Sequence, residues 1–271
     1  MTKLPKRSKK PTGGGEEGRV DQLMVGSVAK TFRILEAFDP SRPSLSLTQL
    51  AAVTGLDKSA TQRFTHSLVK LGLLYKNPDT KRFELAPRNL DLGYRYLRTN
   101  KILDRAMPYL LQLSQETEET VNLTMLDGTD IVYLARLVSR HVLTVDVMVG
   151  TRLPAYCTAP GIAMLSCLPR EQVRDILQRS DLIAYTPSTT YKLADLDKKI
   201  ARAARNGYDV AFEERIRGDL SIAAAVVSAN GYPAAAVNIG LSRARYTPEA
   251  AEGKFAQLVV ATAAAISQTP A

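Results

Sequence analysis

The sequence predicts an α+β protein of two domains, as its length, hydrophobic pattern and charge distribution indicate. With 271 residues, the chain is long enough for two domains of ordinary size. Apolar residues recur at helical spacing in the first third of the chain, whereas from Val121 they alternate with a period of two. Residues 1–105 carry 20 Lys and Arg against 10 Asp and Glu, and residues 106–271 carry 16 against 17. The whole positive excess therefore falls in the first part of the chain.

Three helices are predicted at the start of the ordered chain. The first begins at Ser27, which we expect to be its N-cap, and ends before the Pro40 to Pro43 segment. The second runs from Leu47 to Gly55, a glycine of the kind that ends helices. The third covers residues 58–71 and places Phe64, Leu68 and Leu71 on one face, so its other face is polar.

A short hairpin follows the third helix. Residues 73–76 and 81–85 read as two strands around a turn at Asn77–Thr80. Three helices followed by a basic hairpin are typical of a winged helix-turn-helix, which binds DNA. We assign residues 23–87 to this domain. Residues 1–22, which contain few large apolar side chains, are predicted to be a flexible basic arm, and residues 88–105 a connector helix.

The second domain, residues 106–271, is predicted to combine antiparallel strands with helices. Helical sequence continues to about Thr120, with an interruption at Pro108, and a hairpin covers residues 121–134. A third strand is expected at 142–149 and a second hairpin at 221–239, turning at Asn230 and Gly231. Helices are expected at 159–168, 170–179, 193–206 and 248–266. This mixture predicts an α/β domain of the kind that binds small molecules.

The polar face of the third helix supplies the candidate DNA-reading residues. Gln pairs well with adenine and Arg with guanine in the major groove, so Gln62 and Arg63 are the expected base contacts. Lysine and arginine at a helix start or on a wing suit the phosphate backbone. The full predicted DNA-binding set is Lys58, Ser59, Thr61, Gln62, Arg63, His66, Lys81 and Arg82. A solvated helix face is the alternative for any one of these residues, and charge asymmetry alone would also suit mere solubility.

Several segments together resemble the IclR family of bacterial repressors and activators. In the first domain the similar segments are Ser27–Lys30, Leu47–Ala51, Gly55–Ser59 and Leu71–Leu74. In the second they are Gly150–Pro154, Thr158–Gly161, Gly207–Tyr208, Glu213–Glu214 and Ile222–Ala224. The resemblance implies a GAF/PAS-like effector-binding domain, a homodimer or dimer of dimers, double-stranded operator DNA as partner, and control of a catabolic operon. Residues 153–158 are similar to members that govern aromatic-acid degradation, so a small organic acid, and an aromatic one within that class, is the implied effector.

The resemblance also implies that four positions contact the effector. The chain departs from the family pattern at these positions. Glyoxylate-responsive members have an acidic residue, a cysteine and two serines at these positions. This chain instead has Ala211, Ser221, Asn238 and Gly240. Glyoxylate is therefore not the expected effector.

The remaining effector residues are predicted from the expected secondary structure. The first N–H groups of a helix attract carboxylates, and Gly161 and Ile162 are expected to offer them after Thr158. Thr158 serving only as the helix cap is the alternative. The predicted effector set is Thr158, Gly161, Ile162, Ser221 and Asn238, with Tyr133, Met148 and Phe212 as apolar walls, although a wall residue is more often plain core.

Catalysis and membrane attachment have little support in the sequence. His66 lies in the DNA-reading helix and His141 in a predicted turn, so no catalytic triad, Cys–His pair or metal site is indicated. Glu213 and Glu214 are expected on opposite faces of a strand. The chain lacks an apolar stretch that would cross a bilayer, and Cys157 and Cys167 form no disulfide framework. We expect a cytoplasmic protein with no cofactor and no membrane partner, and the competing hypotheses are an enzyme and a ligand-free architectural DNA-binding protein.

Overall fold

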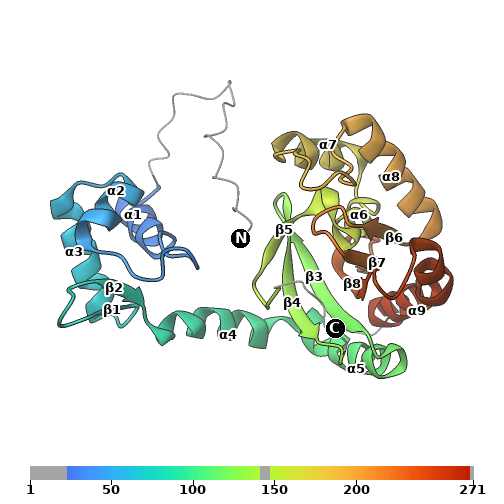
Figure 1. Ribbon diagram of the computed structural model, residues 1–271, viewed down its shortest axis with the longest axis horizontal. Coiled ribbons are helices and arrows are strands. Elements are labelled where there is room, and N and C mark those ends of the chain that lie inside the picture. The colour runs from blue at the N-terminus through green and yellow to red at the C-terminus, as the bar shows by residue number, and fades with distance from the viewer. Residues whose placement is uncertain (1–22, 141–146, 269–271) are drawn as a thin grey trace. The chain divides into compact units, whose positions relative to one another are not determined.

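The computed structural model describes residues 23–140 and 147–268. The chain forms two compact units that divide between Leu92 and Gly93 (Figure 1). The predicted arm at residues 1–22 lies outside the described residues, so its flexibility stays a prediction.

The first unit contains three helices, α1 (Gly26–Leu35), α2 (Leu47–Thr54) and α3 (Lys58–Lys70). Ser46 and Gln49 cap α2 reciprocally, and Gly55 ends it with a φ of 67°. The Asp57 side chain caps α3 by accepting from the Ala60 N–H at 2.7 Å. The prediction that Ser27 caps the first helix is wrong, because Ser27 lies inside α1 and the N-cap position is Val25, which makes no side-chain cap bond.

A hairpin of β1 (Leu74–Lys76) and β2 (Phe83–Leu85) completes the first unit. Phe83 joins it to the segment before α2, since its backbone exchanges hydrogen bonds with Leu45 at 2.8 and 3.0 Å. The core of the unit consists of buried side chains from all of these elements: Ile34, Ala37, Leu45, Leu50, Leu68, Leu74 and Phe83. The predicted winged helix-turn-helix is confirmed.

A 3-10 turn (Pro87–Asn89) leads into two helices in place of one continuous connector. These are α4 (Leu90–Thr99) and α5 (Lys101–Thr117), and the Asn100 side chain caps α5 by accepting from Leu103 N at 3.2 Å. The predicted interruption at Pro108 is wrong, because α5 continues through it. Ala106 and Leu110 are buried on either side of the proline, so core packing maintains the helix despite the missing N–H.

The second unit is built on a six-stranded antiparallel sheet in the order β5-β4-β3-β8-β7-β6. Both predicted hairpins are confirmed. The strands are β3 (Thr120–Asp127), β4 (Asp130–Leu137), β5 (Arg152–Pro154), β6 (Asp209–Phe212), β7 (Asp219–Val227) and β8 (Pro233–Ser242). The short edge strands β5 and β6 were not predicted, since three or four residues give too little alternation to recognise.

The strand predicted at 142–149 is only partly covered by the described residues. Residues 142–146 lie outside them, and Val147 to Val149 belong to no strand. The chain instead turns back to β4 just after this segment, where Gly150 N–H donates to Tyr133 O at 2.8 Å. The predicted strand is therefore wrong over its described part.

Helices cover both faces of the sheet (Figure 1). Buried residues of α5 and α9 (Pro248–Gln268) pack with Val121, Ile222 and Ile239 on one face. On the other face lie α6 (Ala159–Leu165), α7 (Arg170–Arg179) and α8 (Leu193–Asn206), with a 3-10 turn (Ala155–Cys157) before α6. The predicted α+β class, a winged helix-turn-helix followed by an α/β domain, is confirmed.

Gly161 allows the turn before α6 to pack directly against that helix. A Cβ at this position would lie 2.1 Å from Ala155 O and 2.5 Å from Ala155 Cα, closer than real Cβ atoms approach backbone. We expect Gly161→Ala to destabilise the second unit by about 3 kcal/mol, because backbone must move to relieve the contact. Thermal and urea unfolding measure this change.

Gly253→Ala is the matched control for that experiment. Gly253 lies inside α9, and a Cβ there would meet nothing within 4 Å. This substitution should stabilise the protein by about 0.5–1 kcal/mol, because alanine loses less backbone entropy in a helix. Equal effects of the two substitutions would contradict the proposed contact.

Candidate functional site

Helix α3 presents five of the predicted DNA-binding residues to solvent. Lys58, Ser59, Gln62, Arg63 and His66 are all exposed. The spacing of 100° per residue places these side chains away from Leu68 and the core. The exposed face of α3 is therefore polar and positively charged.

Thr61 does not belong to this face. It is completely buried, and its hydroxyl donates to Asp57 O at 2.8 Å. Positions 61, 65 and 68 share one side of the helix, and all three are buried. The sequence prediction of a DNA contact for Thr61 is at odds with this burial, so we leave it out of the candidate interface.

The hairpin residues Lys81 and Arg82 differ in their surroundings. Lys81 is exposed, with a left-handed φ of 58°. Arg82 is half-buried, and its Nε and Nη2 donate to Ser44 Oγ at 3.1 Å and Ser44 O at 2.6 Å. Arg82 therefore holds the hairpin to the segment before α2, and only part of its guanidinium is left for a phosphate.

A hollow lies between α3 and the hairpin. Predicted residues line it together with one that the sequence analysis missed, Lys76 on β1. Its lining contains no carboxylate, and the charged and polar members are Ser59, Gln62, Arg63, Thr65, His66, Ser67, Lys76 and Lys81. An electropositive hollow of this kind suits a phosphate backbone.

The second unit carries a row of polar side chains across the face of its sheet. The strand register pairs Arg136 with Asn122, Asn122 with Asn238, Asn238 with Ala223, and Ala223 with Asp209. Directly paired residues point to the same face of a sheet. One row on the α6 side thus contains a cation, two amides and a carboxylate.

A pocket opens over this row. Its lining includes Asn122, Arg136 and Asn238 of the row, and Ser221 from the neighbouring position on β7. Arg136 Nη1 donates to Asn122 Oδ1 at 3.2 Å, and Asn238 Nδ2 donates to Ser221 Oγ at 3.0 Å. Asn238 Oδ1 is buried, and none of the residues that the structure describes donates a hydrogen bond to it. A buried polar atom of this kind is usually satisfied by water or by a ligand.

The loop between β6 and β7 supplies the opposite wall. Glu214, Arg215 and Ile216 of this loop line the pocket, as does Asp219, the first residue of β7. Burial raises the pKa of Asp219 to about 6, although the nearby Arg136 opposes the shift. The pocket therefore contains two arginines and two acidic side chains, one of which has reduced acidity.

Four predicted effector residues line the pocket and four do not. Tyr133, Thr158, Ser221 and Asn238 contribute to the lining, as do the resemblance-derived positions Ala211 and Gly240. Gly161, Ile162, Met148 and Phe212 are absent from it.

Each of the four absent residues has another position or role. The Ile162 N–H already donates to Thr158 O at 3.0 Å, and Gly161 packs against Ala155. Met148 is 71% exposed, and Phe212 is half-buried beneath the Arg243 guanidinium. The predicted ligand site at the start of this helix is therefore not supported.

Thr158 does not cap α6. Its hydroxyl donates backwards to Pro154 O at 3.2 Å and Ala155 O at 3.3 Å, and no side-chain cap bond is present. The capping interpretation is wrong, because the 3-10 turn places acceptors closer to the hydroxyl than the N–H groups of the helix are.

The pocket residues that the sequence analysis missed are mainly Asn122, Arg136 and Arg215. The first two lie on strands, and the alternation of β3 and β4 would have placed them on the polar face once the register was known. Arg215 lies in a loop, where no periodicity indicates direction.

Potential nucleophiles in the pocket are protonated at neutral pH. Burial raises the pKa of the Cys157 thiol to about 12 and raises the pKa of the Tyr133 phenol. A thiolate is the nucleophilic form of cysteine, so Cys157 is chemically inert here. Glu213 and Glu214 follow β6 in a loop, instead of lying on a strand, and bind different partners, Arg243 and Lys199.

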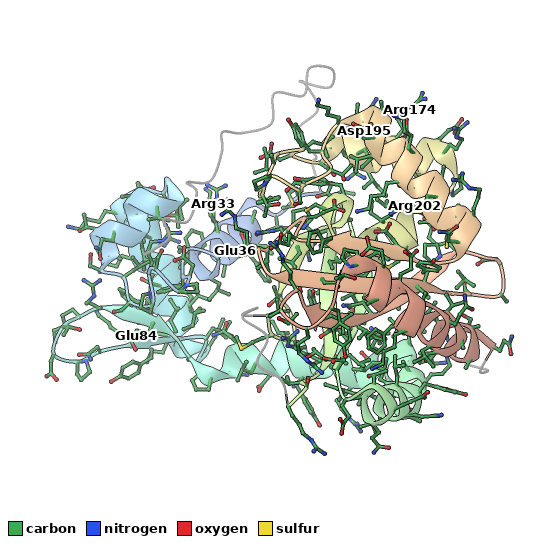
Figure 2. All side chains as sticks on the ribbon, turned by 45° about the vertical axis from the view of Figure 1, so that its right-hand side comes forward. Arg33, Glu36, Glu84, Arg174, Asp195 and Arg202 are labelled. Atoms are coloured by element: carbon green, nitrogen blue, oxygen red, sulfur yellow. The ribbon has the colours of Figure 1, made fainter. Side chains whose placement is uncertain are left out.

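A buried ionic cluster lies behind the pocket. Lys199 on α8 contacts Glu214 and lies 3.4 Å from Asp209 Oδ2, and Arg202 lies 3.4 Å from Asp209 Oδ1. Arg202 and Asp195 both belong to α8 (Figure 2). Burial raises the pKa of Asp209 to about 6 even though Lys199 and Arg202 favour its ionised form, while Glu214 opposes ionisation.

This cluster predicts a pH-dependent contribution to stability. The ordinary pKa of Asp209 is 3.8 and its folded value is about 6. A carboxyl with a raised folded pKa contributes stability below pH 4 that is lost as the pH rises through 6. Compared with Asp209→Asn, the wild type should lose up to about 3 kcal/mol of unfolding free energy across this range. Urea unfolding at several pH values measures the difference.

Asp195→Asn serves as the control, since Asp195 lies on the same helix with half of its side chain exposed. That substitution should leave the pH dependence of the unfolding free energy close to that of the wild type. A difference in unfolding free energy between wild type and Asp209→Asn that stays constant from pH 4 to 7 would contradict the raised pKa of Asp209.

The described residues contain neither a metal cluster nor a membrane helix. In 23–140 and 147–268, no group of three His, Cys, Asp or Glu side chains could hold a metal ion. No helix in the described part of the chain is long and apolar enough to span a bilayer.

Two family models match the sequence. The helix-turn-helix domain of IclR matches residues 27–78, and the C-terminal domain of the bacterial transcriptional regulator IclR matches residues 94–268. The Pca regulon regulatory protein of Pseudomonas putida is 32% identical over 89% of this chain and 82% of its own length. The p-hydroxybenzoate hydroxylase transcriptional activator of Acinetobacter baylyi is 30% identical over 86% and 87%.

Solved structures share the fold. A putative transcriptional regulator from Rhodococcus is 33% identical, covers 90% of this chain and 98% of its own, and superposes with a TM-score of 0.79. An IclR homologue from Microbacterium hydrocarbonoxydans, solved with 4-hydroxybenzoate, is 22% identical and covers 89% and 97%, with a TM-score of 0.73. The curated relatives are transcription regulators and not enzymes.

Proposed function

Because the chain belongs to the IclR family of bacterial transcription regulators, we propose that it controls a catabolic operon in response to a small organic acid. In this proposal α3 and the β1–β2 hairpin bind double-stranded operator DNA, and the pocket of the second unit binds the acid. The observation that carries the proposal is the row of Arg136, Asn122 and Asn238 in a pocket of a chain that also contains a family-matched DNA-binding domain. Such regulators work where the chromosome is, in the cytoplasm, as repressors or activators.

The exposed face of α3 supports sequence reading. Gln62 and Arg63 carry donors and acceptors that match adenine and guanine edges in the major groove. Lys58, at the start of the helix, and Lys76 and Lys81, at the hollow, suit phosphates, which add affinity without sequence preference. Ser59 and His66 lie close enough on the same face to contribute to either kind of contact.

Substitutions on α3 and the hairpin should therefore have different effects. Arg63→Ala should weaken operator binding by about 10- to 100-fold and relax the preference at one base pair. Lys81→Ala should weaken the binding of operator and random DNA equally. It should also reduce the slope of log affinity against log salt concentration by about one. Fluorescence anisotropy with both DNAs at several salt concentrations measures these effects.

Lys70→Ala is the charge-matched control, because Lys70 is exposed on the last turn of α3 and does not line the hollow. It should leave both affinities close to the wild-type values. Unchanged operator selectivity in Arg63→Ala would contradict base reading by this residue.

The pocket chemistry supports an organic acid as the effector. A carboxylate that leaves water needs charged or amide donors, and Arg136 and Arg215 carry the positive charge. Ser221 and the orphaned amide oxygen of Asn238 can bind a further polar group. Apolar walls from Leu153, Pro160 and Ile216 suit the hydrocarbon part of the molecule.

An aromatic acid is the class that the relatives favour. One curated relative is a p-hydroxybenzoate hydroxylase transcriptional activator, and a structural neighbour was solved with 4-hydroxybenzoate. The alternative of glyoxylate is disfavoured because Ala211 and Gly240 offer no polar side chain. We therefore propose a hydroxylated aromatic acid as the effector.

Thermal shift measurements test this proposal. Millimolar 4-hydroxybenzoate should raise the Tm of the wild type, because a ligand that binds only the folded state stabilises it. Asn238→Ala should reduce the shift relative to its own ligand-free Tm, whereas Asn206→Ala, exposed at the end of α8, should not. If benzoate, 4-hydroxybenzoate, pyruvate and succinate all leave the Tm unchanged, the protein is better described as a constitutive DNA-binding protein.

The regulatory coupling we propose requires paired DNA-binding domains. A homodimer or dimer of dimers would present two α3 helices to half-sites about 10 bp, or a multiple of it, apart. The effector changes operator affinity only if it binds one arrangement of the assembly more tightly than another.

A further inference from the structure

We infer that Arg215 selects a carboxylate over a neutral ligand in the pocket, and that Lys199 is its positioning residue, acting through Glu214. The inference deepens the proposed function and rests on it. Three observations carry it: the stacked position of Arg215, the absence of a partner for its charge, and the way in which Glu214 is held.

The guanidinium of Arg215 has a fixed position against an aromatic stack. Its Cζ lies 4.0 Å from the centroid of the Tyr185 ring, and Tyr185 stacks on Tyr156 with centroids 6.5 Å apart. The Tyr156 hydroxyl is anchored in turn by Ile183 O at 2.8 Å. A guanidinium stacked in this way keeps its N–H edge free for a planar, two-pronged acceptor such as a carboxylate.

No ion pair within residues 23–140 and 147–268 neutralises the charge of Arg215. Arg215 forms no ion pair with any described residue, and its Nε is buried without a hydrogen-bond acceptor. Arg136, the other pocket arginine, by contrast donates to Asn122 and interacts with Asp219. A buried donor without an acceptor indicates a missing partner, and an anionic ligand in the pocket would supply it.

Glu214, the residue next to Arg215, would be the natural internal partner. Its carboxylate is instead bound by Lys199 Nζ and by Thr190 N–H at 3.2 Å. Its backbone oxygen accepts from the Thr189 hydroxyl at 2.5 Å, and that of Glu213 accepts from Thr186 at 2.5 Å. Lys199 thus binds the Glu214 carboxylate, although Glu214 itself lines the pocket, and leaves the Arg215 guanidinium available to the ligand.

This arrangement makes a prediction about Lys199, although it does not line the pocket. Without the ammonium group, the buried Glu214 carboxylate has lost its cation, and Arg215, the next residue in the chain, carries a positive charge on the same loop. Pairing between them would cancel the charge that the ligand needs. Removing the carboxylate as well, with Glu214→Gln, should then restore the preference for an acid.

The experiment compares two probes on the full-length protein, 4-hydroxybenzoate and the uncharged 4-hydroxybenzamide, by isothermal titration calorimetry. The wild type should bind the acid more tightly than the amide. Arg215→Gln should weaken the binding of the acid by about 10- to 100-fold and leave the binding of the amide nearly unchanged. Arg215→Lys keeps the charge but lacks the planar guanidinium. It should give an intermediate ratio of acid affinity to amide affinity. Arg217→Gln, exposed on the same loop, is the control and should behave as the wild type.

Lys199→Met should lower the acid-to-amide ratio, and Lys199→Met combined with Glu214→Gln should return it towards the wild-type value. If Lys199 had a purely structural role, Lys199→Met would lower the affinity for both probes equally, and the added Glu214→Gln would not restore the acid-to-amide ratio. That result would overturn the positioning role. Circular dichroism confirms that each variant is folded before titration.

The outcomes distinguish failure of the proposed aromatic-acid effector from failure of the role assigned to Arg215. Failure of the wild type to bind 4-hydroxybenzoate at millimolar concentration would overturn the proposed aromatic-acid effector, and this inference with it. Binding of the acid by the wild type, together with an unchanged ratio in Arg215→Gln and Arg215→Lys, would overturn the assignment of Arg215 alone.

Discussion

The antiparallel register of β3 and β8 is the constraint on which the candidate effector site depends. It aligns Asn122 with Asn238 on the α6 side of the sheet and Val121 with Ile239 on the side covered by α5 and α9. A slip of one residue would bury the amides in the apolar core and expose the valine and isoleucine to the pocket. The same apolar packing that stabilises the sheet therefore also places the polar row.

Much of the fold could be predicted from the sequence because the decisive signals are local. Caps such as Asp57, the stop at Gly55 and the turn at Asn230–Gly231 define the helices and hairpins without reference to the rest of the chain. Local signals failed where tertiary packing decides the outcome. Pro108 remains within α5 because its neighbours are buried, and Ser27 lies inside a helix that begins one residue earlier.

The candidate sites were less predictable than the fold. Helical spacing identified the exposed face of α3, but the prediction also included Thr61, which is buried on the same side of the helix as Leu68. In the second unit, Ser221 and Asn238 came from the family resemblance, whereas Arg136 required the strand register and Arg215 the path of a loop. The cations that give the pocket its chemistry are thus the residues that sequence reasoning could not place.

We propose that the polar row of the sheet is the binding site for an organic acid. A crystal structure of the protein grown with 4-hydroxybenzoate tests it most directly. We expect a ligand in the pocket over Asn122 and Asn238, with its carboxylate within hydrogen-bond distance of an arginine. A ligand bound instead in the groove lined by Leu168, Val173 and Ile200 of the α7–α8 region, with the polar row unoccupied, would contradict it.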